Sequence, residues 1–253
     1  MMIDIVSFIL PEEKESVHSF AQSVQYIEKS THQGISRLVA TPLVAKDDLI
    51  NIYDKLTVKI GRINRQLSDY NIDSKVVPGL KVKVFPELME EKYINEIIIL
   101  AHRFNYLLLE LPNDAYPEYI HDVCYQLQMK GITPILNAVE LKTYFQRDPM
   151  QLYRLVKNGS ATQIQAASIL GRHGKKARNF AQQMIESNQA HLIHSDATRE
   201  TEILNQALEV IEKKYGKEYK KYFQNNADSM ANGNEIEKFQ PNRIKGKSKL
   251  KFW

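Results

Sequence analysis

Short runs of β-branched and aliphatic residues alternate along the chain with longer segments in which apolar residues recur every three to four positions. The short runs have the composition of buried strands, and the longer segments have the period of amphipathic helices. This alternation predicts parallel strands joined by right-handed crossovers, as in an α/β barrel or an open parallel sheet. The predicted strands are Ile3–Ile5, Ser36–Ala40, Lys75–Val77 continued by Val82–Val84, Tyr106–Glu110, Thr133–Leu136, Ala161–Ile164 and His191–His194.

Helical spacing is clearest in three segments. Apolar residues repeat with this spacing from Val17 to Ile27, from Leu49 to Ile63 and from Ile120 to Leu127. Each segment therefore predicts a helix with one face to bury against a sheet. Seven strand positions separated by such helices favour an irregular α/β fold over residues 1–227, a distorted seven-stranded βα barrel of the TIM-like kind in a single domain.

The composition is that of an ordinary globular protein. Of the 253 residues, 43% are hydrophobic and 25% are charged, which excludes a disordered or fibrous chain. The longest apolar runs fall far short of the roughly 20 residues that cross a bilayer, and the N-terminus lacks the basic region of a secretory signal. We therefore expect a cytoplasmic protein. Cys124 lies on a predicted helix as a core thiol, and Lys130 six residues later excludes the Cys-x5-Arg loop of cysteine-based tyrosine phosphatases.

The positive charge is concentrated at the C-terminus. Residues 238–253 hold six basic side chains and no acidic one, so the other 237 residues carry 28 basic and all 30 acidic side chains, a net charge of −2. Residues 228–253 are predicted to form a flexible basic and aromatic tail. The stretch from Lys238 to Trp253 favours peripheral contact with the anionic inner face of a membrane, and a solvated tail is the alternative. No recognition motif accompanies these charges, so we expect no nucleic-acid partner.

Functional groups of parallel α/β folds gather at the carboxyl ends of the strands. At and around these ends the chain has the segments DIVSFILP, ISRLVATP, VVPGLKVKV, YLLLELP, GITPILNAVE and LYRLVKNGSATQIQAASILGRHGKKARNFAQQMIESNQAHLIHSDA. In the order and spacing of these segments the chain resembles the bacterial tyrosine-protein phosphatases of the PHP (polymerase and histidinol phosphatase) superfamily. The resemblance implies a distorted seven-stranded βα barrel and a manganese-dependent hydrolase of capsule or exopolysaccharide loci, which acts on the phosphotyrosine tail of a partner kinase.

The chain departs from this family at most positions to which the resemblance assigns metal binding. Of the metal-binding set only Glu110 and Asp196 are kept, and Glu140 is kept from the segment that holds a histidine and an arginine in the family. Lys81 stands where the family has a bridging glutamate. The positions that have lost a family histidine are Val6, Phe8, Leu43, Val44, Ala138 and Thr198, and Leu141 replaces the arginine.

These replacements argue against a metal centre. Aliphatic and aromatic side chains offer no lone pair to an ion, and an ammonium at position 81 repels a divalent ion by on the order of several kcal/mol in a low dielectric. We therefore expect no cofactor where the family has manganese. We expect the Lys81 ammonium to replace the metal and to bridge Glu110 and Asp196. The alternative is that both carboxylates cap the backbone at strand ends.

Basic residues next to a helix start are the candidate phosphate contacts. Arg172, Lys175 and Lys176 surround the start of a predicted helix, and Arg199 follows Asp196. A helix N-terminus with nearby cations can bind a phosphoryl group through backbone N–H groups. The alternative is a helix start with solvated basic side chains.

Together these features predict a catalytically impaired pseudophosphatase. It would bind a bacterial tyrosine kinase or its phosphotyrosine tail in the regulation of polysaccharide synthesis. The alternative is an active protein-tyrosine phosphatase that uses a shifted metal site or Glu110, Glu140 and Asp196 as catalytic carboxylates. Repulsion between these carboxylates and a phosphate dianion favours the first hypothesis. A third hypothesis is that the chain is a decayed gene product without a selected role.

Overall fold

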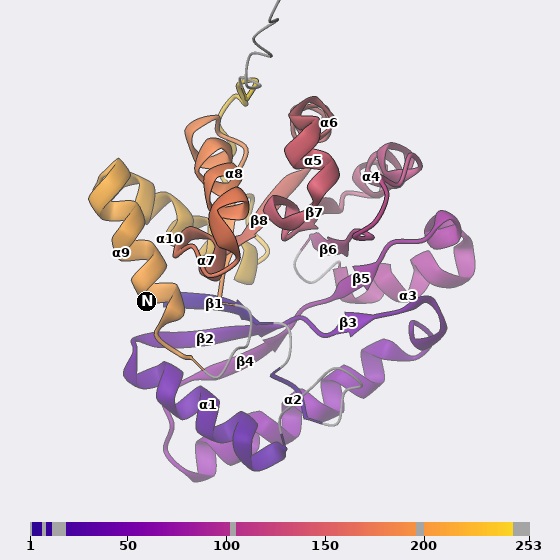
Figure 1. The fold of residues 1–253 in the computed structure, drawn as a ribbon. Coiled ribbons are helices and arrows are strands. Elements are labelled where there is room, and N and C mark those ends of the chain that lie inside the picture. The colour runs from indigo at the N-terminus through magenta and orange to yellow at the C-terminus, as the bar shows by residue number, and fades with distance from the viewer. Residues whose placement is uncertain (1, 7–8, 12–18, 102–104, 196–199, 245–253) are drawn as a thin grey trace, which may run out of the picture.

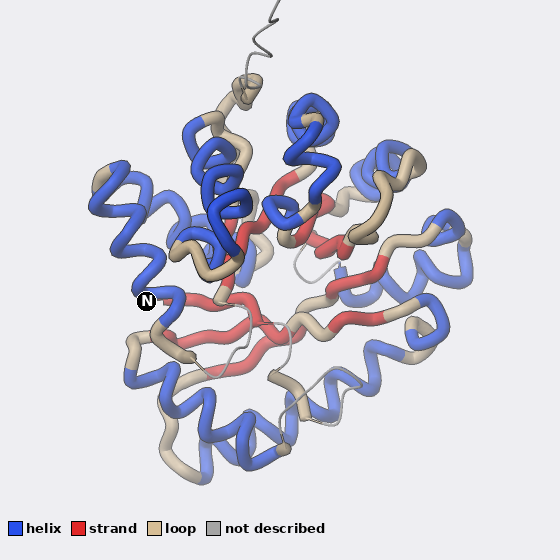
Figure 2. The backbone as a smooth tube through the Cα atoms, in the orientation of Figure 1, coloured by secondary structure: helices blue, strands red, loops and turns tan. Residues whose placement is uncertain are grey.

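The fold is seen in a computed structural model, which describes residues 2–6, 9–11, 19–101, 105–195 and 200–244 (Figure 1). Its strands lie inside and its helices outside (Figure 2). The strands are β1 (Met2–Val6), β2 (Ile35–Ala40), β3 (Leu43–Val44), β4 (Lys75–Pro78), β5 (Lys81–Lys83), β6 (Tyr106–Glu110), β7 (Thr133–Asn137), β8 (Ala161–Gln165) and β9 (Leu192–His194). The helices are α1 (Phe20–His32), α2 (Ile52–Asp69), α3 (Glu91–Ala101), α4 (Ile120–Met129), α5 (Thr143–Arg147), α6 (Pro149–Lys157), α7 (Ala166–Ile169), α8 (Gly174–Glu186), α9 (Ile203–Tyr215) and α10 (Lys217–Ala231), with short 3-10 helices η1 (Lys46–Asp48), η2 (Pro86–Met89) and η3 (Val139–Leu141).

Within the described residues the strands form two parallel sheets. One has the order β1-β2-β4 and the other the order β3-β5-β6-β7-β8-β9. The predicted α/β class is confirmed, and every pairing between these strands is parallel. Six predicted strand positions each match one strand, whereas Lys75–Val77 and Val82–Val84, predicted as one position, fall in β4 and β5 of different sheets. A closed seven-stranded barrel is not confirmed. The far edges of the sheets are nevertheless close, because the Ser195 N–H after β9 donates to Asp4 Oδ1 of β1 at 3.0 Å.

The two sheets meet where two neighbouring strands break at the same level. β2 is followed by Thr41 and Pro42 before β3, and β4 is followed by Gly79 and Leu80 before β5. Pro42 has no N–H to donate to a ladder. Backbone hydrogen bonds still link the two breaks, from Gly79 N to Ala40 O at 2.8 Å and from Lys81 N to Pro42 O at 3.3 Å. The short strand β3 is not among the predicted strands.

The helices cover the sheets with the faces that the sequence predicts. α1 begins with a capping box in which Ser19 and Gln22 satisfy each other's backbone N–H groups. α2 buries Leu56, Ile60, Ile63 and Leu67, a stripe at helical spacing. α4 buries Cys124, as predicted, and burial raises the pKa of its thiol to about 11. In the described part of the chain, none of the helices has the length and apolar character that crossing a membrane requires.

The C-terminal part of the described chain packs against the body of the protein. The predicted boundary at residue 228 falls inside α10. Beyond this helix the Ile236 side chain is 2% exposed, and its N–H donates to the Tyr106 hydroxyl at 2.9 Å. Asn226 of α10 accepts from Glu237 N at 2.8 Å and donates to His191 O at 3.0 Å. Residues 228–244 therefore differ from the free tail that we predicted, because several of their backbone polar groups are hydrogen-bonded to the body.

The basic residues of this segment are also partly engaged. Lys238 Nζ donates to Gly159 O at 2.9 Å, and burial lowers the pKa of this ammonium. The Phe239 ring stacks on Tyr222 at a centroid distance of 5.0 Å. Arg243 lies over the Tyr153 ring. Residues 245–253 lie outside the described residues, so membrane contact through Lys238–Trp253 stays a prediction.

Candidate functional site

The carboxyl ends of β5, β6, β7 and β8 and the strand β3 border one cavity of about 610 Å³. It contains five of the positions selected from the sequence, namely Leu43, Lys81, Glu110, Ala138 and Leu141. Parallel strands bring residues at strand ends together because their carboxyl ends meet at one edge of the sheet. Other parts of the wall come from the segment after β3, from the loop after β6 and from the η3–α5 junction, which add Ala45, Asp48, Leu111–Asp114 and Lys142.

Glu110 is the central carboxylate of the cavity, and both of its oxygens have partners. Lys142 Nζ lies 2.7 Å from Glu110 Oε1, and Asn137 Nδ2 donates to Glu110 Oε2 at 2.7 Å. The Lys142 ammonium also donates to Leu111 O and to Asn113 Oδ1, each at 2.7 Å. The side chain of Lys142 is only 3% exposed, so this ion pair lies largely out of solvent.

The counter-ion of Glu110 therefore differs from the one we predicted. The ion pair that the structure records for Glu110 is with Lys142, whereas the sequence analysis assigned this role to Lys81. Lys81 lines the same cavity and is 4% exposed. In the β5–β6 register it stands opposite Leu108, and Lys83 stands opposite Glu110. The predicted contact between Lys81 and Asp196 lies outside the described residues and stays a prediction.

Lys142 and the amide side chains of Asn113 and Asn137 were not predicted as site residues from the sequence. Lys142 lies 32 residues from Glu110 along the chain, and local spacing carries no signal for such a pairing. One signal was available for Asn137, since it stands at the carboxyl end of a predicted strand, where side chains point into the functional edge.

The residues around Glu110 do not fit a manganese centre. Val6 is fully buried, and Leu43 and Ala138 line the cavity at positions to which the family resemblance assigns histidines. None of the three offers a lone pair to an ion. Within the described ranges, no group of three or more His, Cys, Asp or Glu residues is arranged to hold a metal. Phe8, Asp196, Thr198 and Arg199 lie outside those ranges.

Glu140 is a structural carboxylate in this arrangement and not a wall of the cavity. It is fully buried, and its Oε1 accepts from Gln165 N at 3.0 Å and from Ser168 Oγ at 2.7 Å, which caps the start of α7. Burial raises the pKa of Glu140 to about 7. The catalytic role considered for Glu140 is therefore not supported, because its carboxylate faces α7.

Three of the predicted phosphate contacts, Arg172, Lys175 and Lys176, lie around the start of α8. Arg172 forms an ion pair with Glu200, and its Nη2 donates to Gln206 Oε1 at 3.3 Å. Lys175 and Lys176 are exposed in the first turn of α8. None of these three basic residues is part of the cavity wall.

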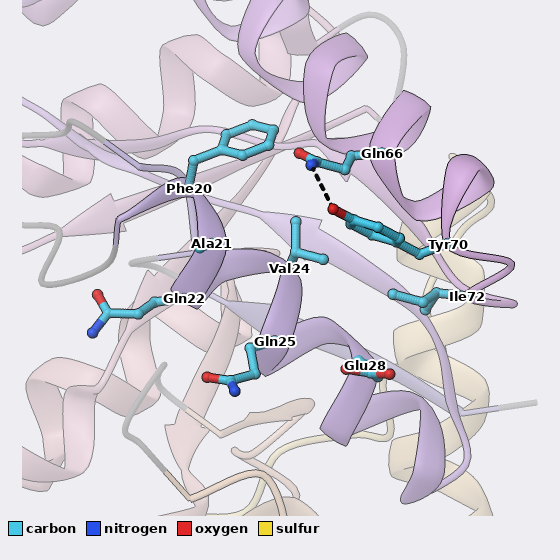
Figure 3. A pocket seen from close by; sticks show the side chains of 9 residues that line it. All are labelled: Phe20, Ala21, Gln22, Val24, Gln25, Glu28, Gln66, Tyr70 and Ile72. Carbon is cyan, nitrogen blue, oxygen red and sulfur yellow. Dashed lines mark hydrogen bonds between the residues drawn. The ribbon is translucent and has the colours of Figure 1, made fainter.

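A second hollow, of about 530 Å³, lies between α1 and α2 (Figure 3). Phe20 and Val24 line it from α1, and Tyr70 and Ile72 line it from the end of α2 and the turn that follows. Gln66 Nε2 donates to the Tyr70 hydroxyl at 3.4 Å across its edge. The hollow contains none of the residues that the sequence analysis selected.

Two curated relatives are similar to this chain over most of their length. The tyrosine-protein phosphatase YwqE of Bacillus subtilis is 28% identical over 256 residues, which covers 100% of both chains. The tyrosine-protein phosphatase CpsB of Streptococcus pneumoniae is 24% identical over 234 residues, 89% of this chain and 96% of that protein.

Solved structures give the same picture of the fold. One, from work on YwqE and CpsB described as unique metal-dependent tyrosine phosphatases, matches with a TM-score of 0.89 and 29% identity, over 97% of this chain and 100% of that one. Histidinol phosphate phosphatase from Lactococcus lactis shares the fold more distantly, with a TM-score of 0.54 and 14% identity over 84% and 93% of the two chains.

A family model described as capsular polysaccharide synthesis, CpsB/CapC, matches residues 2–232. This match spans both sheets and every strand that borders the cavity. The chain therefore belongs to the CpsB/CapC family of capsular polysaccharide synthesis.

Proposed function

We propose that this chain is a pseudophosphatase of capsule synthesis that binds the phosphotyrosine tail of a partner tyrosine kinase in the cavity and does not hydrolyse it. The relatives YwqE and CpsB are named tyrosine-protein phosphatases, which gives the class of ligand. The proposal that the chain does not hydrolyse its ligand is supported by the Glu110–Lys142 ion pair, in a wall where Leu43, Lys81 and Ala138 stand at positions to which the family resemblance assigns metal ligands.

Hydrolysis needs a nucleophile that this set of side chains does not supply. A metal-bound water has its pKa lowered toward 7, and aliphatic residues cannot hold the ion that lowers it. The described wall holds the carboxylates of Asp48, Glu110 and Asp114. Both oxygens of Glu110 are already engaged, by the Lys142 ammonium and by the Asn137 amide, each at 2.7 Å. Glu140 faces α7 instead of the cavity.

Binding of a phosphoryl group requires cationic side chains, but no nucleophile. Lys81 and Lys83 bring two ammonium groups to the cavity wall, and Lys83 is exposed at its mouth. Aliphatic surface from Leu43, Pro112 and Leu141 is available for an aromatic ring. A phosphotyrosine side chain combines these two features, an anionic end and an apolar ring.

Two assays on the full chain test this proposal. Phosphate release from a phosphotyrosine peptide is measured with added MnCl2, with YwqE of Bacillus subtilis as the active reference. Fluorescence anisotropy then compares a labelled phosphotyrosine peptide with the unphosphorylated peptide. We expect no phosphate release above the protein-free blank, and binding of the phosphorylated peptide alone.

Variants connect the binding to the cavity. Lys83→Ala removes one charge-assisted contact and is expected to weaken peptide binding about tenfold. Lys213→Ala removes an exposed lysine of α9 and serves as the control, with unchanged binding. Manganese-dependent turnover that disappears in Glu110→Gln would support the alternative, an active phosphatase. Equal binding of the phosphorylated and unphosphorylated peptides would also contradict the proposal.

A further inference from the structure

The ammonium of Lys142 sits in a complete shell of oxygen atoms. Its three acceptors are Glu110 Oε1, Leu111 O and Asn113 Oδ1, each 2.7 Å from Nζ. A lysine ammonium has three protons, so each proton has its own acceptor. The residue is 3% exposed, and the shell therefore replaces most of the water that would otherwise solvate the charge.

The chemistry of this shell is that of a hard-cation site. A carboxylate, a main-chain carbonyl and a side-chain amide oxygen are the ligands that Ca²⁺, Mg²⁺ and Mn²⁺ take in proteins. All three come from the short stretch between Glu110 and Asn113, where β6 passes into its loop. The arrangement holds oxygen atoms around one positive charge, which here is supplied by the chain itself.

Lys142 delivers this charge from a different part of the fold. Its backbone forms the junction between η3 and α5, where its N–H donates to Val139 O and its carbonyl accepts from Phe145 N, each at 3.1 Å. The side chain thus ties the η3–α5 junction to the loop after β6. Without it, the Glu110 carboxylate would face two other oxygen acceptors with no ammonium among the three, which is unfavourable in a largely buried site.

We propose that Lys142 is a positioning residue that occupies an oxygen-lined cation site, in which its ammonium takes the place of a bound metal ion and fixes Glu110 and the loop from Leu111 to Asn113. The side chain makes the shape of the cavity independent of added metal. Removing the ammonium leaves the oxygens in place and opens the site to a divalent cation.

The test compares the wild-type protein with Lys142→Ala by calorimetric titration of CaCl2 and, separately, MnCl2. We expect saturable binding of about one ion per chain to Lys142→Ala, with a Kd of about 10⁻⁴ to 10⁻³ M because only three protein oxygens are available. The wild-type protein and Lys213→Ala are expected to show no saturable binding. Lys142→Met, which fills the space without a charge, is expected to bind no ion.

A second measurement separates this role from ordinary packing. Lys142→Ala should have a lower Tm than the wild-type protein, and CaCl2 should restore part of the loss in this variant alone. Adding Glu110→Gln to Lys142→Ala should abolish the restoration. If calcium binds Lys142→Met as well as Lys142→Ala, or if Lys142→Ala binds no ion, the proposal is wrong.

Folding of the variant can itself be used as a readout. Where Lys142→Ala does not fold in metal-free buffer, it is refolded from urea with and without CaCl2. Refolding that depends on calcium supports the proposal, and failure in both buffers contradicts it. None of these readouts involves a phosphopeptide, so their failure is distinguishable from failure of the proposed function.

Discussion

Glu140 and His191 are buried side chains whose pKa values are shifted in opposite directions by the same cause. Burial raises the pKa of Glu140 to about 7, even though Ser168 and Gln165 donate to its carboxylate. Burial lowers the pKa of His191 to about 3, and Thr162 N donates to its Nδ1, which requires that this nitrogen carries no proton. Each group therefore links the stability of the fold to pH in its own window.

For Glu140 the window lies between its ordinary pKa of 4.5 and the raised value of about 7. In this range the folded protein keeps a proton that the unfolded chain has lost, so the free energy of unfolding falls as pH rises, by on the order of 3 kcal/mol. Glu140→Gln should remove this decline. Urea unfolding at pH 5, 6 and 7.5 measures it, and Glu209→Gln, on the exposed side of α9, is the control. An identical pH slope in wild type and Glu140→Gln would contradict the assignment.

For His191 the window lies between its ordinary pKa of 6.5 and about 3. The unfolded chain takes up a proton here that the folded protein does not, so stability is lost as pH falls, by on the order of 5 kcal/mol over the whole range. His191→Asn keeps an acceptor for Thr162 N but does not titrate. We expect the Tm of this variant to fall less than that of wild type between pH 7 and pH 4.5. The exposed His32→Asn should behave as wild type does, and an equal fall in all three proteins would rule the explanation out.

At the scale of elements, Gly79 controls how the two sheets meet. It follows β4 at the break between the sheets, and a Cβ there would lie 2.8 Å from side-chain atoms of both Thr41 and Val39. Only a residue without a side chain allows this approach of the two neighbouring breaks. Gly79 is two residues from Lys81, the first residue of β5. The geometry of the break therefore determines where Lys81 lies in the cavity wall.

We expect Gly79→Ala to lower the free energy of unfolding by about 1–3 kcal/mol, because Val39 and Thr41 must move. Gly61→Ala is the matched control, since nothing lies within 4 Å of a Cβ at this position in α2. It should stabilise the protein by about 0.5–1 kcal/mol through its helix propensity. Chemical denaturation of both variants measures the difference. An unchanged free energy of unfolding in Gly79→Ala would show that the break between the sheets has space for a Cβ atom.

The segment after α10 makes a second prediction at this scale. Ile236 is 2% exposed and is held by the Tyr106 hydroxyl, so Ile236→Ala should cost about 2–4 kcal/mol. Ile50 is 43% exposed, and Ile50→Ala should cost less than about 1 kcal/mol. Equal, small losses of Tm in the two variants would mean that the segment does not pack on the body in solution.

Periodicity predicted the elements better than it predicted their connections. Strands such as Tyr106–Glu110 and helices such as α2 are visible because each buries a regular stripe of apolar residues. The end of α10 was assigned to the predicted tail because the helix is polar overall and its buried face includes Asn226. The pairing of Glu110 with Lys142 was missed for a different reason. It depends on how the end of β6 and the η3–α5 junction, far apart in the sequence, are placed in space, and no local pattern records this.

At the scale of the whole molecule, the fold is that of the CpsB/CapC family, and we propose that the wall of its cavity differs from the family's metal site. The chain matches a solved relative with a TM-score of 0.89, yet Leu43, Lys81 and Ala138 line the edge to which the family resemblance assigns metal ligands. Glu110 is held by an ammonium of the chain itself. The central claim is therefore that the cavity recognises its ligand without a metal centre.

The metal content of the full chain tests this claim most directly. The protein is produced in medium supplemented with manganese and purified without a chelator, and manganese, iron and zinc are then measured by elemental analysis beside YwqE prepared in the same way. We predict far less than one ion per chain for this protein. One or more ions per chain, lost in Glu110→Gln, would contradict the account.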